Sequence, residues 1–100
     1  MTSIKAPDGL HFGDTFMVEY EPPRRYTGGL WARADCYQNG THVYAQYVNV
    51  DDTSSQDGPF TLGPTPSWSG GAASCTVRLL ALSGTRRDKE LATDDFEVLA

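Results

Sequence analysis

Long hydrophobic runs are missing from this sequence. No stretch approaches the roughly 18 apolar residues that a membrane-spanning helix needs. The first 20 residues contain Lys5, Asp8, Asp14 and Glu19 and no apolar run of signal-peptide length. We therefore expect no membrane partner and no signal peptide, and we expect the chain to be synthesised and folded in the cytoplasm.

Basic residues are also scarce. The chain has 8 Lys and Arg residues against 13 Asp and Glu residues, which gives a formal net charge of −5. Proteins that bind nucleic acid depend on clustered Lys and Arg. The pairs Arg24-Arg25 and Arg86-Arg87 each lie in a predicted turn beside prolines or acidic residues. The sequence therefore predicts no nucleic-acid partner.

Motifs that carry chemistry are absent as well. There is no CxxC pair, no glycine-rich phosphate loop and no HExxH sequence. His11 and His42 are the only histidines, and a metal site or a catalytic triad would need one of them beside other ligands or a nucleophile. The acidic residues Asp51-Asp52, Asp57 and Asp94-Asp95 offer oxygen ligands for calcium, but no ligand-spaced motif surrounds them. We predict that the protein is not an enzyme and has no cofactor and no metal site.

Helical periodicity is missing too, and an alternation of apolar and polar residues takes its place. Turn-forming residues separate the alternating runs about every 8 to 12 residues, and a chain of 100 residues is the size of one domain. The sequence predicts a single domain, residues 1–100, with an all-β, immunoglobulin-like sandwich fold of about seven antiparallel strands. The predicted strands are residues 3–6, 15–21, 30–38, 41–50, 60–62, 73–83 and 90–99.

The most specific prediction concerns residues 30–50. Asn39-Gly40 lies between two alternating runs, and Asn-Gly is favoured in a type I′ hairpin turn because both central residues need positive φ. A two-residue turn places Tyr37 opposite His42 and Cys36 opposite Val43. One face of this hairpin then carries Ala32, Ala34, Cys36, Val43, Ala45 and Tyr47, and the other carries Trp31, Arg33, Asp35, Tyr37, His42, Tyr44, Gln46 and Val48.

The first of these faces is the predicted core side. Trp68, in the centre of a loop rich in Pro and Gly, is expected to plug the core or cap one end of the sandwich, with contact to a ligand as the alternative. The full predicted core is Phe16, Val18, Ala34, Cys36, Val43, Ala45, Tyr47, Trp68, Cys75, Val77, Leu79, Phe96 and Val98.

The two cysteines lie on the third and sixth predicted strands, which are neighbours in one sheet of an immunoglobulin-like sandwich. Cys36 and Cys75 are therefore expected to be cross-strand neighbours. If oxidised, they would close a loop of about 38 residues and contribute about 3 to 4 kcal/mol in the chain-entropy model. Because the cytoplasm is reducing, we expect free thiols that pack as small hydrophobic side chains.

The second hairpin face is the predicted interface. It is rich in aromatic residues, contains an arginine and has little Lys or Glu, which is the composition of the centre of a protein interface. The predicted interface residues are Trp31, Arg33, Asp35, Tyr37, Tyr44 and Val48. The alternative is that these side chains only stabilise an exposed sheet through cross-strand pairs, or that a loop covers them.

Three segments carry a resemblance to known proteins. WARADCYQNGTHVYAQY, PSWSGGAASCTVRLLAL and LATDDFEVLA resemble parts of the small Ig-like domains of tailed bacteriophages that infect actinobacteria, and of surface proteins of their hosts. The resemblance covers about residues 13–99 and rests on positions that support the fold. It implies a capsid decoration protein, a head fibre or a tail-associated virion protein.

Together these observations predict a non-enzymatic virion structural protein, most of all a head decoration protein. It would dock on the capsid surface through the aromatic hairpin face or through the edge strand within residues 1–6. The expected partners are the major capsid protein or other virion subunits. A second copy of the chain is another expected partner. The expected location is the virion surface after synthesis in the host cytoplasm. The alternatives are a tail-associated virion protein and a carbohydrate-binding or host-adhesion module, in which Trp31, Tyr44 or Trp68 stacks on a host surface glycan.

Overall fold

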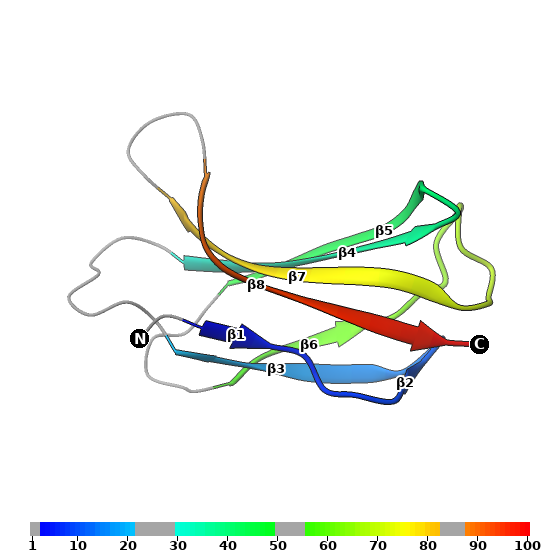
Figure 1. Cartoon of the computed structure of the whole chain (residues 1–100), viewed down its shortest axis with the longest axis horizontal. Coiled ribbons are helices and arrows are strands. Elements are labelled where there is room, and N and C mark those ends of the chain that lie inside the picture. The colour runs from blue at the N-terminus through cyan, green and yellow to red at the C-terminus, as the bar shows by residue number, and fades with distance from the viewer. Residues whose placement is uncertain (1–2, 22–29, 50–55, 83–87) are drawn as a thin grey trace.

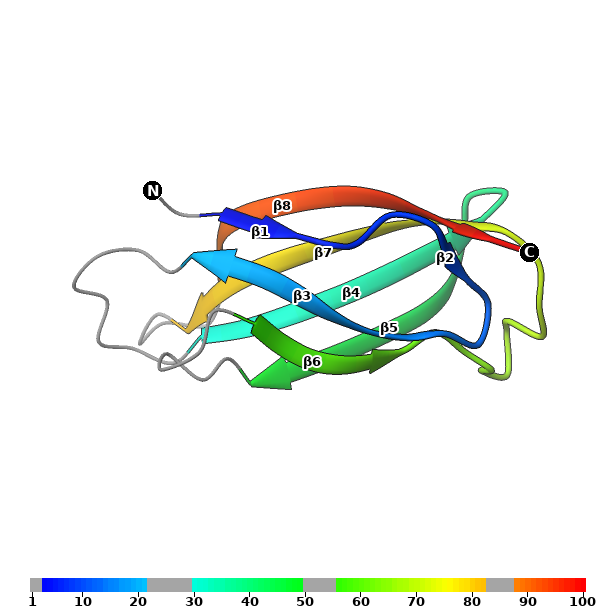
Figure 2. The same cartoon turned by 90° about the horizontal axis from the view of Figure 1, so that it is seen from below.

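Two β-sheets face each other in a sandwich (Figures 1 and 2). This computed structural model describes residues 3–21, 30–49, 56–82 and 88–100. The small sheet has three strands in the order β1 (Ser3–Lys5), β3 (Thr15–Glu21) and β6 (Gln56–Thr61). The large sheet has five in the order β2 (Leu10–His11), β8 (Asp88–Leu99), β7 (Ala73–Leu82), β4 (Leu30–Gln38) and β5 (Thr41–Asn49). The predicted all-β sandwich is confirmed.

The strand order is that of an immunoglobulin-like sandwich, because β3 and β6 lie in one sheet while β4, β7 and β8 lie side by side in the other. The N-terminal segment contributes to both sheets. Pro7-Asp8-Gly9 redirects the chain after β1, Gly9 has a φ of 75°, and β2 then pairs in parallel with the end of β8. The prediction of about seven antiparallel strands did not include β2, because a two-residue strand leaves no alternation to detect.

Some predictions fall on parts of the chain outside the described residues. These are the first two residues of the chain and the predicted turns at residues 22–29, 51–55 and 84–87. The strand predicted at residues 60–62 begins earlier, at Gln56, as β6.

Alternation along the strands builds the core between the sheets. In β3 every second residue is buried, which places Phe16, Val18 and Tyr20 inside. The ring of Phe16 stacks on that of Phe60 at a centroid distance of 5.3 Å and meets the edge of Phe96 from the large sheet at 5.6 Å. These rings therefore join the two sheets across the core. Other predicted core residues are also buried: Ala34, Cys36, Val43, Trp68, Cys75, Val77, Leu79 and Val98.

The β4–β5 hairpin follows the predicted register only near its turn. Asn39 and Gly40 have φ of 52° and 81°, as a type I′ turn requires, and Tyr37 lies opposite His42. A β-bulge then shifts the register by one residue, so Cys36 lies opposite Tyr44 instead of Val43.

The bulge reverses the predicted facing of β5 beyond Tyr44. Ala45 and Tyr47, predicted in the core, are exposed, and Tyr47 is 48% accessible. Tyr44, predicted outside, is buried, and Val48 packs against the core. The physical reason is that two successive residues, Val43 and Tyr44, both find buried positions, which strict alternation does not allow.

The position of Tyr44 is set by the loop between β6 and β7. Trp68 of this loop is fully buried, and its ring packs edge-to-face against Tyr44 at 5.8 Å and against Phe12 at 4.9 Å. The hydroxyl of Thr65 donates to the backbone oxygen of Val43 at 2.6 Å. The loop therefore caps the end of the sandwich at which the β4–β5 turn lies (Figure 1).

Cys36 and Cys75 are direct neighbours in the register of β4 and β7, as predicted. They form a disulfide, however, so the expectation of free thiols was wrong. That expectation rested on the reducing conditions of the cytoplasm. The register of β4 and β7, however, brings the two sulfur atoms together inside the sandwich.

Candidate interaction surface

The outward side of the large sheet, here called the outer face, is the candidate site. Its side chains form rows across four strands because residues directly opposite each other share a face. The rows, from β5 to β8, are Asn49, Trp31, Leu80 and Glu90; Tyr47, Arg33, Arg78 and Thr93; Ala45, Asp35, Thr76 and Asp95; and His42, Tyr37, Ser74 and Glu97. Four of the predicted interface residues, Trp31, Arg33, Asp35 and Tyr37, lie here, and Tyr44 and Val48 do not.

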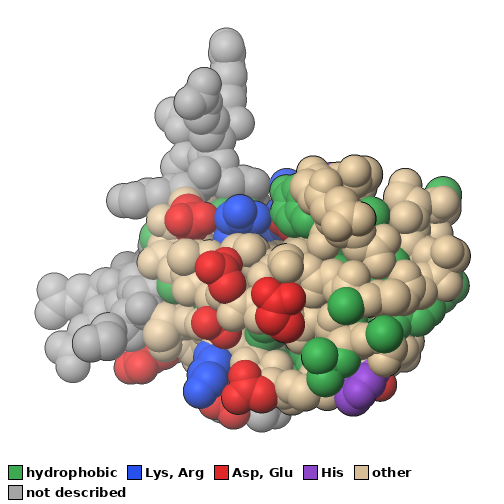
Figure 3. All heavy atoms as spheres, turned by 45° about the vertical axis from the view of Figure 1, so that its right-hand side comes forward, with side chains coloured by type: hydrophobic (Ala, Val, Ile, Leu, Met, Phe, Trp, Pro, Cys, Tyr) green, Lys and Arg blue, Asp and Glu red, His purple; other side chains and the backbone are tan. Residues whose placement is uncertain are grey.

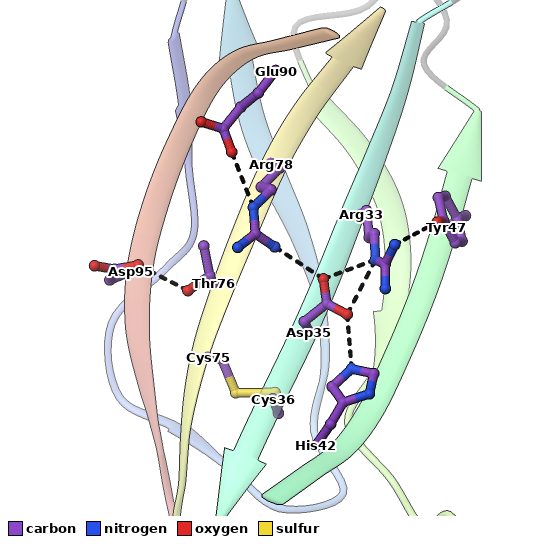
Figure 4. A network of polar contacts seen from close by, with 10 residues as sticks. All are labelled: Arg33, Asp35, Cys36, His42, Tyr47, Cys75, Thr76, Arg78, Glu90 and Asp95. Atoms are coloured by element: carbon purple, nitrogen blue, oxygen red, sulfur yellow. Dashed lines mark hydrogen bonds and ion pairs between the residues drawn. A yellow bond between two sulfur atoms is a disulfide. The ribbon is translucent and has the colours of Figure 1, made fainter. Parts of the chain in front are cut away.

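Asp35 is at the centre of the outer face and is only 1% exposed (Figure 4). Its carboxylate accepts N–H groups from three side chains. Arg33 Nε lies 3.1 Å from Oδ1 and 2.8 Å from Oδ2, Arg78 Nη1 lies 3.1 Å from Oδ2, and His42 Nε2 lies 2.8 Å from Oδ1. A buried carboxylate is stable only with such compensation. Asp35 was predicted as an accessible contact residue, and the covering by these three side chains corrects that prediction.

The same carboxylate holds two positive charges side by side. Arg33 and Arg78 are directly opposite in the register of β4 and β7, a pairing that would be repulsive on its own. The hydrogen bond and the charge of Asp35 raise the pKa of Arg33, against the opposing effect of burial. At the other side of Arg78, Nε donates to Glu90 Oε1 at 3.0 Å. Both guanidinium groups are thus fixed in place and charged.

Aromatic side chains border the arginines on the β4–β5 side. Arg33 Nη1 donates to the Tyr47 hydroxyl at 2.6 Å, and the guanidinium carbon lies 4.9 Å from the centre of the Tyr47 ring. Trp31 packs edge-to-face against Tyr47 at 6.4 Å. We call Trp31, Arg33 and Tyr47 the aromatic–arginine patch.

The opposite border of the outer face, on β8, is acidic. Thr76 donates to Asp95 at 2.8 Å, and Ser74 donates to Glu97 at 3.2 and 3.3 Å. Figure 3, which views the sandwich from its edge, shows acidic side chains with basic ones among them. The outer face is therefore polarised, with acids along β8 and the patch along β4 and β5.

Residues proposed for sugar binding are mostly in the interior. Tyr44 and Trp68 are buried, so neither can stack on a glycan, and Trp31 alone stays partly accessible. The physical reason is the cap described above, in which Trp68 donates from Nε1 to the backbone oxygen of Gly71 at 3.2 Å and packs on Tyr44.

The described part of the chain contains no group of three or more His, Cys, Asp or Glu side chains arranged to hold a metal ion. His11 is exposed and lies 4.0 Å from Asp14, while His42 belongs to the Asp35 cluster. Among the described residues, no helix is long and apolar enough to cross a membrane.

Sequence reasoning missed two members of this surface. Tyr47 was assigned to the core because the bulge was not foreseen, and the consecutive large residues Val43-Tyr44 were the only sign of it. Arg78 was missed because nothing in the sequence connects it with Asp35, which is 43 positions away.

Comparison with known proteins found no matching family model, no matching curated protein and no matching solved structure.

Proposed function

We propose that this chain is a non-enzymatic structural protein of a bacteriophage virion, a head decoration protein that docks on the capsid through the aromatic–arginine patch. The virion context comes from the sequence resemblance. The observation that carries the docking mechanism is the partly exposed arrangement in which Arg33 donates a hydrogen bond to Tyr47 and Trp31 packs against the Tyr47 ring. Trp, Tyr and Arg are the residue types that dominate binding energy at protein interfaces.

The arrangement supports docking for an energetic reason. Binding normally costs about 0.5 to 1.5 kcal/mol for each flexible side chain that becomes ordered. Arg33 is already held by Asp35 and Tyr47, so this cost is reduced in advance. On a capsid, many copies meet a repeating surface, and contacts that are weak singly become effective where subunits are linked or bind at several points.

Capsid docking is preferred to the adhesive alternative because Trp31 is the only accessible residue left of the three proposed for glycan stacking. A tail-associated subunit would use the same patch, and the position of the chain in the particle distinguishes it from a decoration protein.

The test is to image purified particles and to measure association of added protein with particles from a phage lacking the gene. We expect ordered copies on the head, and we expect the double variant Trp31→Ala and Tyr47→Ala to remain folded but to lose association. The matched control is Met17→Ala, which removes a side chain 41% exposed on the small sheet. This control should bind normally.

Three results would contradict the proposal. Retained association of the double variant would move the interface elsewhere. Copies confined to the tail would replace decoration by the tail alternative. Absence from particles, together with saturable glycan binding that Trp31→Ala abolishes, would favour the adhesive module.

A further inference from the structure

Arg33 and Arg78 have more hydrogen-bond donors than the described part of the protein uses. A guanidinium group carries five N–H donors and no acceptor. Among the described residues, Arg33 has acceptors for Nε and for one Nη1 proton, namely Asp35 and Tyr47. Arg78 has Glu90 for Nε and Asp35 for one Nη1 proton. Each side chain is about one-third exposed, at 33% and 34%, so the remaining donors have access to a ligand.

We propose that the Arg33–Arg78 pair is a receptor for a carboxylate, supplied by an Asp or Glu side chain of the partner protein that covers the aromatic–arginine patch. The inference rests on the proposed docking function and adds the chemistry of the partner. A carboxylate accepts two parallel N–H bonds from one guanidinium, or one from each of two neighbouring guanidiniums.

The buried carboxylate of Asp35 holds both arginines in place before a ligand binds. Asp35, with its side chain 2% exposed, binds both arginines from within the sheet and fixes them opposite each other. The exposed edges of the two guanidiniums are therefore positioned before the ligand arrives (Figure 4). Because Arg presents a rigid planar fork, a fixed pair selects acceptors by geometry as well as by charge.

Charge limits the ligand to one carboxylate in an otherwise apolar setting. Asp35 and Glu90 together offset the two positive charges, so the unused N–H donors of the arginines, rather than a net positive charge, favour a single acceptor carboxylate. The acidic residues Asp95 and Glu97 farther along β8 repel a polyanion such as nucleic acid, in keeping with the net charge of −5. A partner segment must therefore approach over β4 and β5, where Trp31 and Tyr47 offer apolar contact.

The decisive variants are Arg33→Lys and Arg78→Lys, separately and together. Lysine keeps a positive charge beside Asp35 but loses the planar fork, so the fold should persist, and its thermal unfolding serves as the check. We expect binding to gene-deleted particles to weaken about 10- to 100-fold for the double variant. Lys5→Ala, which removes an exposed basic side chain from the small sheet, is the matched control and should bind as well as the parent.

A second measurement makes the inference independent of the virion. The side-chain Nε–H signals of Arg33 and Arg78 are followed by NMR while the capped dipeptide acetyl-Leu-Glu-amide is added, with acetyl-Leu-Gln-amide as the uncharged comparison. We expect saturable shifts with the first and none with the second. Inorganic phosphate is the third probe, and it should shift these signals less than the Glu dipeptide.

The outcomes separate this inference from the proposed function. If Trp31→Ala with Tyr47→Ala abolishes particle binding while the lysine variants bind normally, the docking function stands and the carboxylate receptor is wrong. If the protein never associates with particles but the Glu dipeptide shifts the arginine signals, the receptor stands and the virion role fails. Equal responses to the Glu and Gln dipeptides, or a stronger response to phosphate, overturn the inference.

Discussion

Cys36 of β4 and Cys75 of β7 lie directly opposite each other, and a disulfide joins them in the interior of the sandwich. Both residues are buried, at 0% and 3% exposure, and they are 39 positions apart in the chain. A cross-link of this span restricts the unfolded chain and contributes about 4 kcal/mol in the chain-entropy model. For a domain of 100 residues, that is a large share of a typical total stability.

The first prediction is that reduction lowers stability strongly without removing the fold. Urea unfolding with and without reductant should differ by about 2 to 4 kcal/mol. The double variant Cys36→Ala and Cys75→Ala, measured without reductant, should resemble the reduced parent, because both lack the cross-link and keep small apolar side chains. Equal unfolding midpoints for the oxidised and reduced parent would show that the bond contributes nothing.

The second prediction concerns Gly63, just after β6. Its φ is 72°, and a Cβ atom there would lie 2.4 Å from Cε1 of Phe12. Phe12 cannot move away freely because its ring packs on the buried Trp68. Gly63→Ala should therefore cost about 3 kcal/mol or more, from backbone strain and overlap together.

Gly40 provides the matched control for that prediction. It also has positive φ, 81°, but a Cβ atom there would meet nothing within 4 Å. Gly40→Ala should cost only about 1 to 2 kcal/mol from the backbone conformation. Thermal unfolding of both variants gives the comparison, and equal losses would mean that the contact with Phe12 is relieved at no cost.

Much of the fold was predictable from local patterns, and the part that was not depends on one irregularity. Alternation in β3 and the Asn39-Gly40 turn specified their strands because each is decided by neighbouring residues. The bulge was not predictable, because Tyr44 is buried next to Val43 through its contact with Trp68, which is remote in the sequence.

The candidate site was likewise predictable only where it depends on neighbouring residues of one strand. Trp31 and Arg33 were placed correctly because β4 alternates without interruption on the outer face. The burial of Asp35 was missed because two of the three side chains that cover it, Arg78 and His42, reach it from other strands. Local periodicity thus predicts on which side of the sheet a side chain lies. Its exposure and its partners depend on contacts with other strands.

The third prediction is a loss of stability at high pH that depends on Tyr44. Burial raises the pKa of Tyr44 above its usual value, and the nearby charge of Asp35 acts in the same direction. Folded protein therefore retains the phenol proton at pH values where the unfolded chain releases it. The stabilisation is complete below about pH 10, the pKa of an unperturbed Tyr, and declines as the pH rises above it.

The measurement is urea unfolding from about pH 8 to pH 11, across the ordinary pKa of Tyr. The parent should lose stability over this range, and Tyr44→Phe should lose less because it has no phenol proton to release. Tyr37→Phe, which alters a ring 39% exposed, is the control and should follow the parent. Identical slopes for the parent and Tyr44→Phe would contradict the assigned burial.

The last prediction concerns Gln46, whose side chain bridges the edges of the two sheets. Its Oε1 accepts the backbone N–H of Thr61 at 3.1 Å and the hydroxyl of Tyr44 at 2.7 Å, and its Nε2 donates to the backbone oxygen of Pro59 at 3.2 Å. The amide group thus pairs with the backbone of β6 as a neighbouring strand would. Gln46→Ala should cost about 1 to 3 kcal/mol, since it leaves these groups without their partner.

Hydrogen exchange at Thr61 tests the bridge directly. In Gln46→Ala the Thr61 amide should exchange at least about tenfold faster, because its acceptor is lost, which corresponds to about 1.4 kcal/mol. Gln46→Glu keeps an acceptor for this amide but loses the donor to Pro59, so protection of Thr61 should persist while stability still falls. Asn49→Ala, an exposed change on the same strand, should alter neither quantity. Unchanged exchange of Thr61 in Gln46→Ala would mean that the packing of β5 against β6, rather than this side chain, closes that side of the sandwich.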